Sequence, residues 1–179
     1  MRDTGAVRAF VAVAIPDAAA EIVRGLDRPA LRQVRWTTPE QWHVTVRFLG
    51  EVADPAPLAA ALGAVPTHLR ARHAGTVRAE LGPASAWFPG RQVLQVPVAG
   101  LDALAAVVDE VVSPWCAPSD YPFTGHLTLA RVRGRARGPA SLAGTPVAAA
   151  WVVEEVALMS STLEPGGARH RVESVVALR

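Results

Sequence analysis

Cysteine and lysine are the residues that this sequence of 179 amino acids lacks most clearly. Cys116 is the only cysteine, which excludes an intramolecular disulfide and a cysteine-based metal cluster and favours a reducing, cytoplasmic location. All 18 basic residues are arginine, a bias that we attribute to genome composition. The net charge of +2 is too small to predict a surface that coats nucleic acid.

Long hydrophobic runs are also missing. Half of the residues are hydrophobic and 19% are charged, a balance typical of a globular protein and not of a disordered one. The apolar stretch 9–15 ends at Pro16, which is too short for a signal-peptide core, and no segment approaches a membrane span. We therefore expect one globular domain over residues 1–179, without a membrane partner.

The periodicity of the apolar residues predicts a mixture of strands and helices. A turn is expected at residues 164–167, and Asp17 is a candidate helix N-cap. Residues 139–150 are expected to form a linker or a short helix. The expected strands are 8–15, 42–49, 76–81, 93–98, 125–132, 151–159 and 171–178, and the expected helices are 18–33, 57–72 with a break near Pro66, and 101–112.

One short pattern occurs twice, on two of the expected strands. The copies are His43-Val44-Thr45-Val46 and His126-Leu127-Thr128-Leu129. Because residues i and i+2 of a strand share a face, the histidine and threonine of each copy project into the same space. The valines and leucines on the other face would bury the strand in a core. Each strand thus presents one titratable group and one hydroxyl to a common cleft.

Two imidazoles across a cleft are suited to general acid-base catalysis near neutral pH. Thr45 and Thr128 could hold the non-bridging oxygens of a phosphate whose charge rises in the transition state. Arg131, just after the second copy, is a third candidate for phosphate binding. The set fits in-line attack on a phosphodiester without a metal or cofactor. Residue chemistry alone leaves open which histidine is the acid and which the base.

Other candidate sites in the sequence are weaker. His68 and His73 lie five residues apart among arginines, and we interpret them as surface residues and not as zinc ligands. The arginines that alternate from Arg131 to Arg137 could form a basic rim of the cleft or a solvated loop. We expect His170 to be peripheral. Phe10 and Phe48 could stack on a base, although aromatic residues on strands belong more often to the core.

The two copies of the pattern resemble the paired motifs of the two-histidine (2H) phosphoesterases. Within them the chain is most similar to the RNA 2',3'-cyclic phosphodiesterases, also called LigT-like or 2'-5' RNA ligase-like proteins. Further segments that carry the resemblance are residues 8–13, the run from His43 to Glu51, and residues 156–161. The sequence departs from the family pattern at Gly125, where proline is common, and near His170, where tyrosine is frequent.

The resemblance implies a bilobal α+β fold, in which two antiparallel sheets face a central cleft and the helices lie outside. It implies hydrolysis of a terminal 2',3'-cyclic phosphate to a 2'-phosphomonoester. His43 would be the proton donor to the 3' oxygen, His126 the proton acceptor from water, and Thr45 and Thr128 the phosphate ligands. The expected partners are RNA ends or small cyclic nucleotides, bound by a monomer. Reversible 2'-5' RNA ligation and a nucleotide-binding module without turnover remain alternatives.

Overall fold

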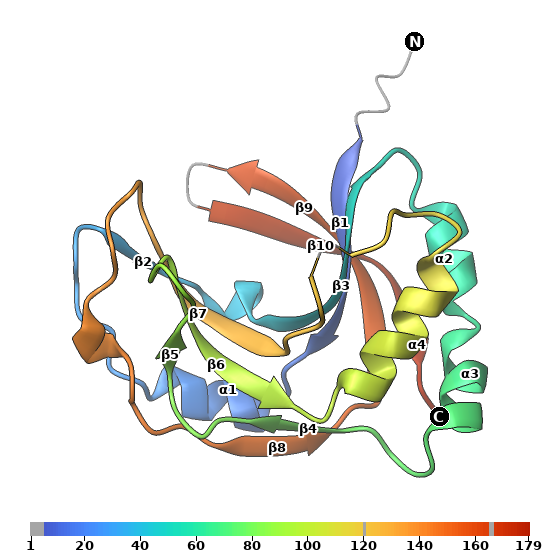
Figure 1. Ribbon diagram of the computed structural model, residues 1–179, viewed down its shortest axis with the longest axis horizontal. Helices are drawn as coiled ribbons and strands as arrows, with labels where there is room; N and C mark the ends of the chain where they lie inside the picture. Colours follow the sequence, from blue (N-terminus) through green and yellow to red (C-terminus); the bar gives the residue numbers. More distant parts are fainter. Residues whose placement is uncertain (1–5, 120, 165–166) are drawn as a thin grey trace.

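The computed structural model describes residues 6–119, 121–164 and 167–179, and in this part of the chain strands predominate over helices (Figure 1). The strands are β1 (Val7–Ala14), β2 (Val34–Trp36), β3 (His43–Val52), β4 (Arg78–Leu81), β5 (Ala86–Trp87), β6 (Val93–Ala99), β7 (His126–Val132), β8 (Ala149–Val152), β9 (Glu155–Glu164) and β10 (Gly167–Ala177). The helices are α1 (Asp17–Arg24), α2 (Ala56–Leu62), α3 (Val65–Arg72), α4 (Asp102–Val112) and the short 3₁₀ turns η1 (Pro39–Gln41) and η2 (Ala140–Leu142). The predicted α+β class is confirmed.

The described strands form one curled antiparallel sheet with two halves. Its order is β10-β9-β1-β3-β7-β6-β4-β8, with β2 beside β7 and β5 beside β6. The halves meet where β3 and β7 pair, through Val44 opposite Leu127. These are the second residues of the two motif copies, so the join lies between the two histidine strands. The two lobes implied by the resemblance are therefore continuous with each other.

The two halves repeat one arrangement around the motif strands. In the first half, β1 leads through α1 and β2 to β3 and pairs with it; in the second, β6 leads through α4 to β7 and pairs with it. The partners on β1 and β6 also correspond, since Ala12 lies opposite Thr45 and Gln95 opposite Thr128. The two motif copies thus occupy equivalent positions in a repeated strand-helix-strand unit.

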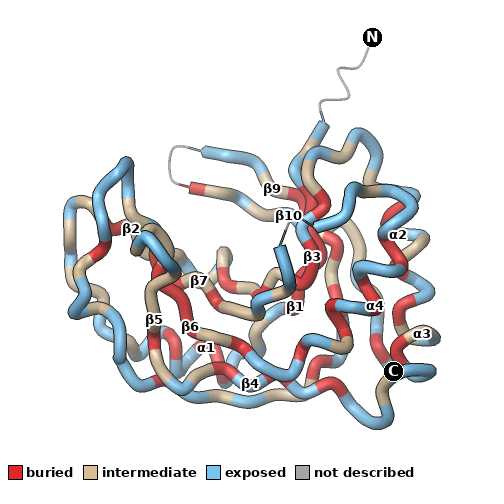
Figure 2. Tube along the Cα trace, viewed as in Figure 1, coloured by how far each residue is buried: buried red, intermediate tan, exposed pale blue. Residues whose placement is uncertain are grey.

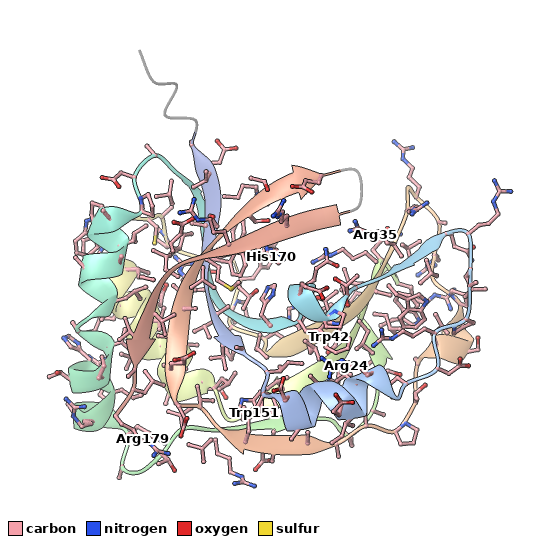
Figure 3. All side chains as sticks on the ribbon, turned by 180° about the vertical axis from the view of Figure 1, so that it is seen from behind. Arg24, Arg35, Trp42, Trp151, His170 and Arg179 are labelled. Carbon is pink, nitrogen blue, oxygen red and sulfur yellow. The ribbon has the colours of Figure 1, made fainter. Side chains whose placement is uncertain are left out.

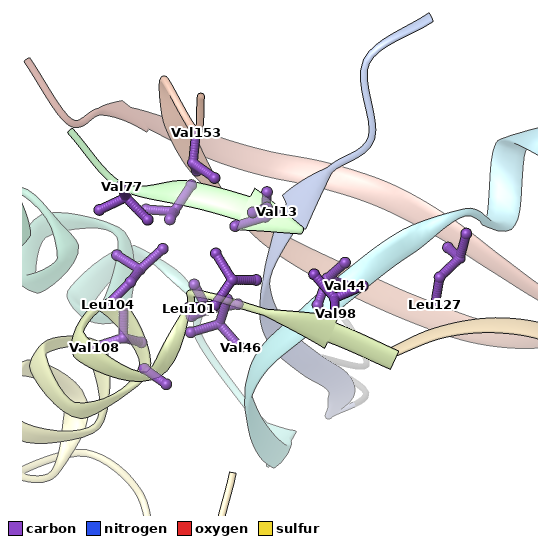
Figure 4. Close-up of a cluster of buried hydrophobic side chains, with 14 of the residues drawn as sticks. Val13, Val44, Val46, Val77, Val98, Leu101, Leu104, Val108, Leu127 and Val153 are labelled. Carbon is purple, nitrogen blue, oxygen red and sulfur yellow. The ribbon is translucent and has the colours of Figure 1, made fainter. Parts of the chain in front are cut away.

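The main core lies on the face of the sheet that carries the motif valines and leucines. Val44 and Leu127 are fully buried there, and Figure 4 shows them in the same buried cluster as Leu101 and Leu104 at the start of α4. Helices α2, α3 and α4 pack together on this side, and α1 lies against β8. Figure 2 shows burial concentrated along the strands and on the inward faces of these helices. The opposite face of the motif strands borders the cleft.

Several predicted boundaries change in the structure. The first helix ends at Arg24 and not near residue 33, because the chain turns at Gly25, and Pro16 rather than Asp17 is its N-cap. The expected strand 151–159 is divided between β8 and β9. The break before Pro66 is confirmed, since α3 begins at Val65. Of the expected turn at 164–167, residues 165 and 166 lie outside the described residues.

None of the helices in the described ranges combines the length and the apolar character that a membrane crossing requires.

Candidate active site

Strands β3 and β7 bring both copies of the motif to a single cleft. His43 and Thr45 line it from β3, and His126 and Thr128 line it from β7. The cleft has a volume of about 380 Å³. Its remaining lining residues are Arg8, Phe10, Arg35, Thr37, Gln41, Phe48, Arg131, Ser161, Leu163, Ala168 and His170. The alternation expected from the sequence therefore holds over the three residues from histidine to threonine in each copy.

An irregularity in each motif strand adds one further side chain to the cleft. Val46 has no partner on β1, and Leu129 has none on β6, because the strand register shifts by one residue at these points. Such a bulge reverses the alternation of faces beyond it. Phe48 and Arg131, each five residues after its histidine, consequently project into the cleft. The expectation that Phe48 belongs to the core is wrong: 47% of it is exposed.

The aromatic rings that contact His43 differ from those that contact His126. The His43 ring stacks on Phe10 with centroids 4.8 Å apart, and His170 meets His43 edge-on at 4.9 Å. His126 has no such pair of neighbours among the described rings; Phe88 meets it edge-on at 4.8 Å. The expectation that His170 is peripheral is therefore wrong, because β10 carries it over the cleft against His43 (Figure 3).

A hydrogen bond to the main chain orients the ring of each motif histidine. Nδ1 of His126 lies 2.8 Å from the carbonyl oxygen of Thr124, and the backbone of Gln41 makes the corresponding bond to His43. Both acceptors lie two residues before their histidine. A ring N–H donated to a carbonyl leaves the other ring nitrogen as the acceptor. For His126 this makes Nε2 the atom that can take a proton.

Burial lowers the pKa of all three cleft histidines. Desolvation, followed by the charge of nearby His170, lowers the pKa of His43 from 6.5 to about 4. Desolvation also lowers the pKa of His126, and that of His170, where the charge of Arg131 adds to the effect. An anion in the cleft would act in the opposite direction, because a negative charge favours the protonated imidazole.

Residues outside the motifs support the second motif strand and close the cleft. The Thr37 hydroxyl lies 2.8 Å from the carbonyl oxygen of Thr128, to which it donates, and accepts a 3.0 Å hydrogen bond from Nε1 of Trp42. The Gln41 side chain donates to the carbonyl oxygen of Ala168 on β10, at 2.6 Å. These contacts tie the segment before β3 to β7 on one side and to the β9–β10 hairpin on the other.

Other candidates from the sequence lie elsewhere. All four alternating arginines are exposed, and Arg131 alone is among the cleft-lining residues. His68 lies on α3, 3.4 Å from a Glu110 carboxylate oxygen. Within the described ranges, no group of three or more His, Cys, Asp or Glu side chains is arranged to hold a metal ion.

Comparison with known proteins identifies the family. A family model described as LigT-like phosphoesterase matches residues 10–88, which include the first motif copy. TT0787 of Thermus thermophilus is 31% identical over 96% of this chain and 98% of its own, and its crystal structure superposes with a TM-score of 0.71. This chain belongs to the LigT-like phosphoesterase family, within the 2H phosphoesterases.

More distant structures share the fold of this LigT-like phosphoesterase. Escherichia coli LigT, crystallised with 3'-AMP, is 23% identical over 97% of this chain and 98% of its own, with a TM-score of 0.69. The MHV ns2 PDE domain is 14% identical over 86% of this chain and 99% of its own, with a TM-score of 0.58. A search of the curated proteins finds no match.

The cleft of this LigT-like phosphoesterase is positively charged. Its charge comes from three arginines, Arg8, Arg35 and Arg131, and no Asp or Glu is among its described lining residues. The charge at the cleft is thus far more one-sided than the net charge of +2 for the chain indicates. Such a surface attracts anions, and two hydroxyls between two imidazoles can hold a phosphate while protons are transferred.

Proposed function

We propose that this protein hydrolyses the terminal 2',3'-cyclic phosphate of RNA to a 2'-phosphomonoester, without a metal ion or another cofactor. The observation that carries the proposal is the convergence of His43, Thr45, His126 and Thr128 in one cationic cleft. Membership of the LigT-like phosphoesterases supports a phosphodiester as substrate. Crystal structures of E. coli LigT with 3'-AMP and with phosphate support a nucleotide as the ligand.

In the proposed mechanism, Thr45 and Thr128 hold the non-bridging oxygens of the cyclic phosphate. Nδ1 of His126 bonds to the Thr124 carbonyl, which leaves Nε2 to take a proton from water. As it does so, the water oxygen attacks phosphorus. The bond from phosphorus to the 3' oxygen breaks, and His43 gives its proton to that oxygen. The products are a free 3' hydroxyl and a 2'-phosphomonoester, and a proton passes from His126 back to His43 through solvent before the next cycle.

The assignment of acid and base depends on the bound substrate. The pKa of about 4 leaves His43 unprotonated at neutral pH in the free protein, which is the wrong state for an acid. The phosphate charge beside it would raise this pKa, so that the complex and not the free protein holds the proton. The fall of activity at high pH reports loss of the His43 proton. It should therefore occur at a higher pKa in the pH profile of kcat, which reports the complex, than in that of kcat/KM, which reports the free protein.

The test is release of a 2'-phosphomonoester from an oligonucleotide that ends in a 2',3'-cyclic phosphate, in EDTA, from about pH 5 to about pH 9. We expect turnover in the wild type and a loss of at least about 100-fold in His43→Ala and His126→Ala, the scale of general acid-base catalysis. His73→Ala, at the end of α3 outside the cleft, is the matched control and should retain activity.

Two other outcomes would favour the alternatives. Joining of the cyclic phosphate end to an added oligonucleotide with a free 5' hydroxyl would indicate 2'-5' ligation, in which that hydroxyl replaces water as the nucleophile and the bond from phosphorus to the 3' oxygen breaks as before. Binding of the oligonucleotide without turnover would indicate a nucleotide-binding module. Near-wild-type hydrolysis by a folded His43→Ala or His126→Ala protein would contradict the mechanism.

We further propose that the protein acts in the cytoplasm as a monomer. A single chain supplies both histidines and both threonines, and the lone Cys116 suits a reducing compartment. Sedimentation of the active protein at assay concentration tests the monomer, since activity that appears only in a larger species would contradict it.

A further inference from the structure

Phe48 gives the cleft an aromatic ring with a free surface. The other phenylalanine among the described lining residues, Phe10, is 3% exposed, and the rings of His43 and His170 contact it. Phe48 lines the same cleft with 47% of its surface exposed. Phe10 therefore belongs to the packing around a catalytic candidate, whereas Phe48 is available to a ligand.

Buried contacts of the neighbouring residue fix the direction of Phe48. Arg47 is 7% exposed, with Nε 2.7 Å from an Asp109 carboxylate oxygen on α4, and it also donates a hydrogen bond to the carbonyl oxygen of Ala117. Successive side chains of a strand point to opposite faces. The contacts that hold Arg47 on the far side of β3 thus keep Phe48 on the side of the cleft.

Arg8 on β1 carries its guanidinium group over the ring of Phe48. The central guanidinium carbon lies 5.1 Å from the ring centroid, and Arg8 also lines the cleft. Although Glu51 lies directly opposite Arg8 on β3, none of the ion pairs between described residues includes Arg8. RNA bases stack on aromatic rings and on guanidinium planes. The two side chains, which we call the Arg8–Phe48 platform, therefore form a flat, cationic surface suited to a nucleobase.

The two halves of the sheet differ in chemistry at equivalent positions. Phe48 and Arg131 each lie five residues after the motif histidine and beyond a bulge. The charge of Arg131 lowers the pKa of all three cleft histidines, so this arginine is within electrostatic reach of the proposed phosphate site. The Phe48 side chain has no charge and no hydrogen-bonding group. Its position in the first half suits a flat, uncharged part of the substrate.

The Arg8–Phe48 platform lies where an RNA strand can leave the cleft. Arg8 is not among the charges that lower the pKa of any cleft histidine, so its charge is farther from them than that of Arg131. Phe48 also lines a second hollow, of about 650 Å³, which β3 and α4 border. A strand whose cyclic phosphate lies between the histidines thus has a continuous open surface across Phe48.

We propose that the Arg8–Phe48 platform stacks on the nucleobase that precedes the nucleotide with the cyclic phosphate. The protein then favours RNA strands of two or more nucleotides, because a free nucleoside 2',3'-cyclic phosphate has no preceding base. A cationic groove with aromatic side chains for successive bases is the usual means of holding a single strand. The inference rests on the proposed function, since it takes the cyclic phosphate to lie between His43 and His126.

Binding of two unreactive dinucleotides tests the platform independently of turnover. One is ApA with a 2'-phosphate on its last nucleotide, and the other is identical except that its first nucleotide lacks the base. Both carry the same phosphates, so the difference in affinity measures the base. We expect calorimetry to show the complete dinucleotide binding about tenfold more tightly, within the range for a base stacked on an aromatic ring. Phe48→Ala should reduce this preference to about twofold or less.

Further variants separate stacking from a structural effect. Phe48→Tyr keeps the ring and should keep the preference, and Phe48→Leu, which removes the ring but keeps an apolar side chain, replaces Phe48→Ala should the latter not fold. Trp115→Ala, at a comparably exposed aromatic residue outside the cleft lining, is the matched control and should preserve the preference. A folded Phe48→Ala protein that retains the tenfold preference would refute the platform. Equal weakening of adenosine 2'-phosphate and the dinucleotide would place the last base there and refute the assignment to the preceding one.

Turnover of the corresponding substrates separates this inference from the proposed function. We compare kcat/KM for adenosine 2',3'-cyclic phosphate with that for ApA ending in a 2',3'-cyclic phosphate, and expect Phe48→Ala to reduce the preference for the dinucleotide about tenfold. No hydrolysis of either compound, with a base preference in binding that depends on Phe48, would refute the proposed function and leave the platform. Hydrolysis of both without preference would refute the platform and leave the function.

Discussion

Anion binding in the cleft should depend on pH because of His43. Its ring contacts those of Phe10 and His170, and desolvation together with the charge of His170 lowers its pKa to about 4. A bound anion favours the protonated ring, so binding of the anion and uptake of a proton assist each other. The affinity for an anion of constant charge must then rise as the pH falls between the pKa of the complex and that of the free protein.

The size of the effect follows from the two pKa values. If bound sulfate returns the pKa of His43 from about 4 to its ordinary 6.5, sulfate binds about 30-fold more tightly at pH 5 than at pH 7.5. Sulfate serves as the probe because its own charge is constant in this range. His126 and His170 add to the dependence in the same direction, since their pKa values are also lowered.

Two measurements check this reasoning. Calorimetry of sulfate binding at both pH values gives the change in affinity, and NMR of the histidine rings gives the pKa of His43 with and without sulfate. His43→Gln should lose most of the pH dependence, and His73→Gln should retain it. A free protein in which His43 titrates near 6.5, or a sulfate affinity that is the same at both pH values, would refute the explanation.

Further outcomes follow from the same contacts. Thr45→Val and Thr128→Val should each reduce kcat about 100-fold or more if the hydroxyls stabilise the transition state, and the corresponding serine variants, assayed beside them, should retain most of it. His170→Phe removes a neighbouring positive charge and should raise the pKa of His43, as read by NMR. Leu127→Ala, at a fully buried position, should lower the free energy of unfolding by about 2–5 kcal/mol in urea titrations. Because the unfolded chain binds the His43 proton more tightly, stability should be lost as pH falls from about 6.5 to about 4, and thermal unfolding should show a smaller loss in His43→Gln.

The local part of the site could be predicted from the sequence. Histidine and threonine two residues apart share a face in any strand, and the apolar residues between them require a core on the other face. Val44 and Leu127 are buried as this pattern demands. Alternation over three residues needs no knowledge of the partner strand, which is why the prediction holds in both copies.

Beyond three residues, the partner strand decides which side chains enter the cleft. Strict alternation along β3 would put Arg47 in the cleft and Phe48 in the core. The bulge at Val46 reverses this order: Arg47 is buried, with Nε 2.7 Å from an Asp109 carboxylate oxygen, and Phe48 lines the cleft. The bulge depends on the register with β1, which no pattern within β3 records.

His170 and Arg35 could not be assigned for a related reason. Each reaches the cleft from a strand that carries no motif, through pairings of β10 with β9 and of β2 with β7. The sequence signal available for His170 is its place between Arg169 and Arg171 at the start of an expected strand, which is equally typical of an exposed edge. Their assignment required the tertiary structure.

Two equivalent histidines can take different roles because their neighbours differ. The repeated unit gives both rings the same main-chain acceptor, two residues before the histidine. The first half then adds Phe10 and His170 beside His43, whereas Phe88 meets His126. Because of these contacts, the protonation of His43 depends more on a bound ligand than that of His126 does. An acid that is charged only when substrate is bound would require this dependence. In the proposed mechanism, the difference between the halves, and not the motif itself, would therefore carry the distinction between acid and base.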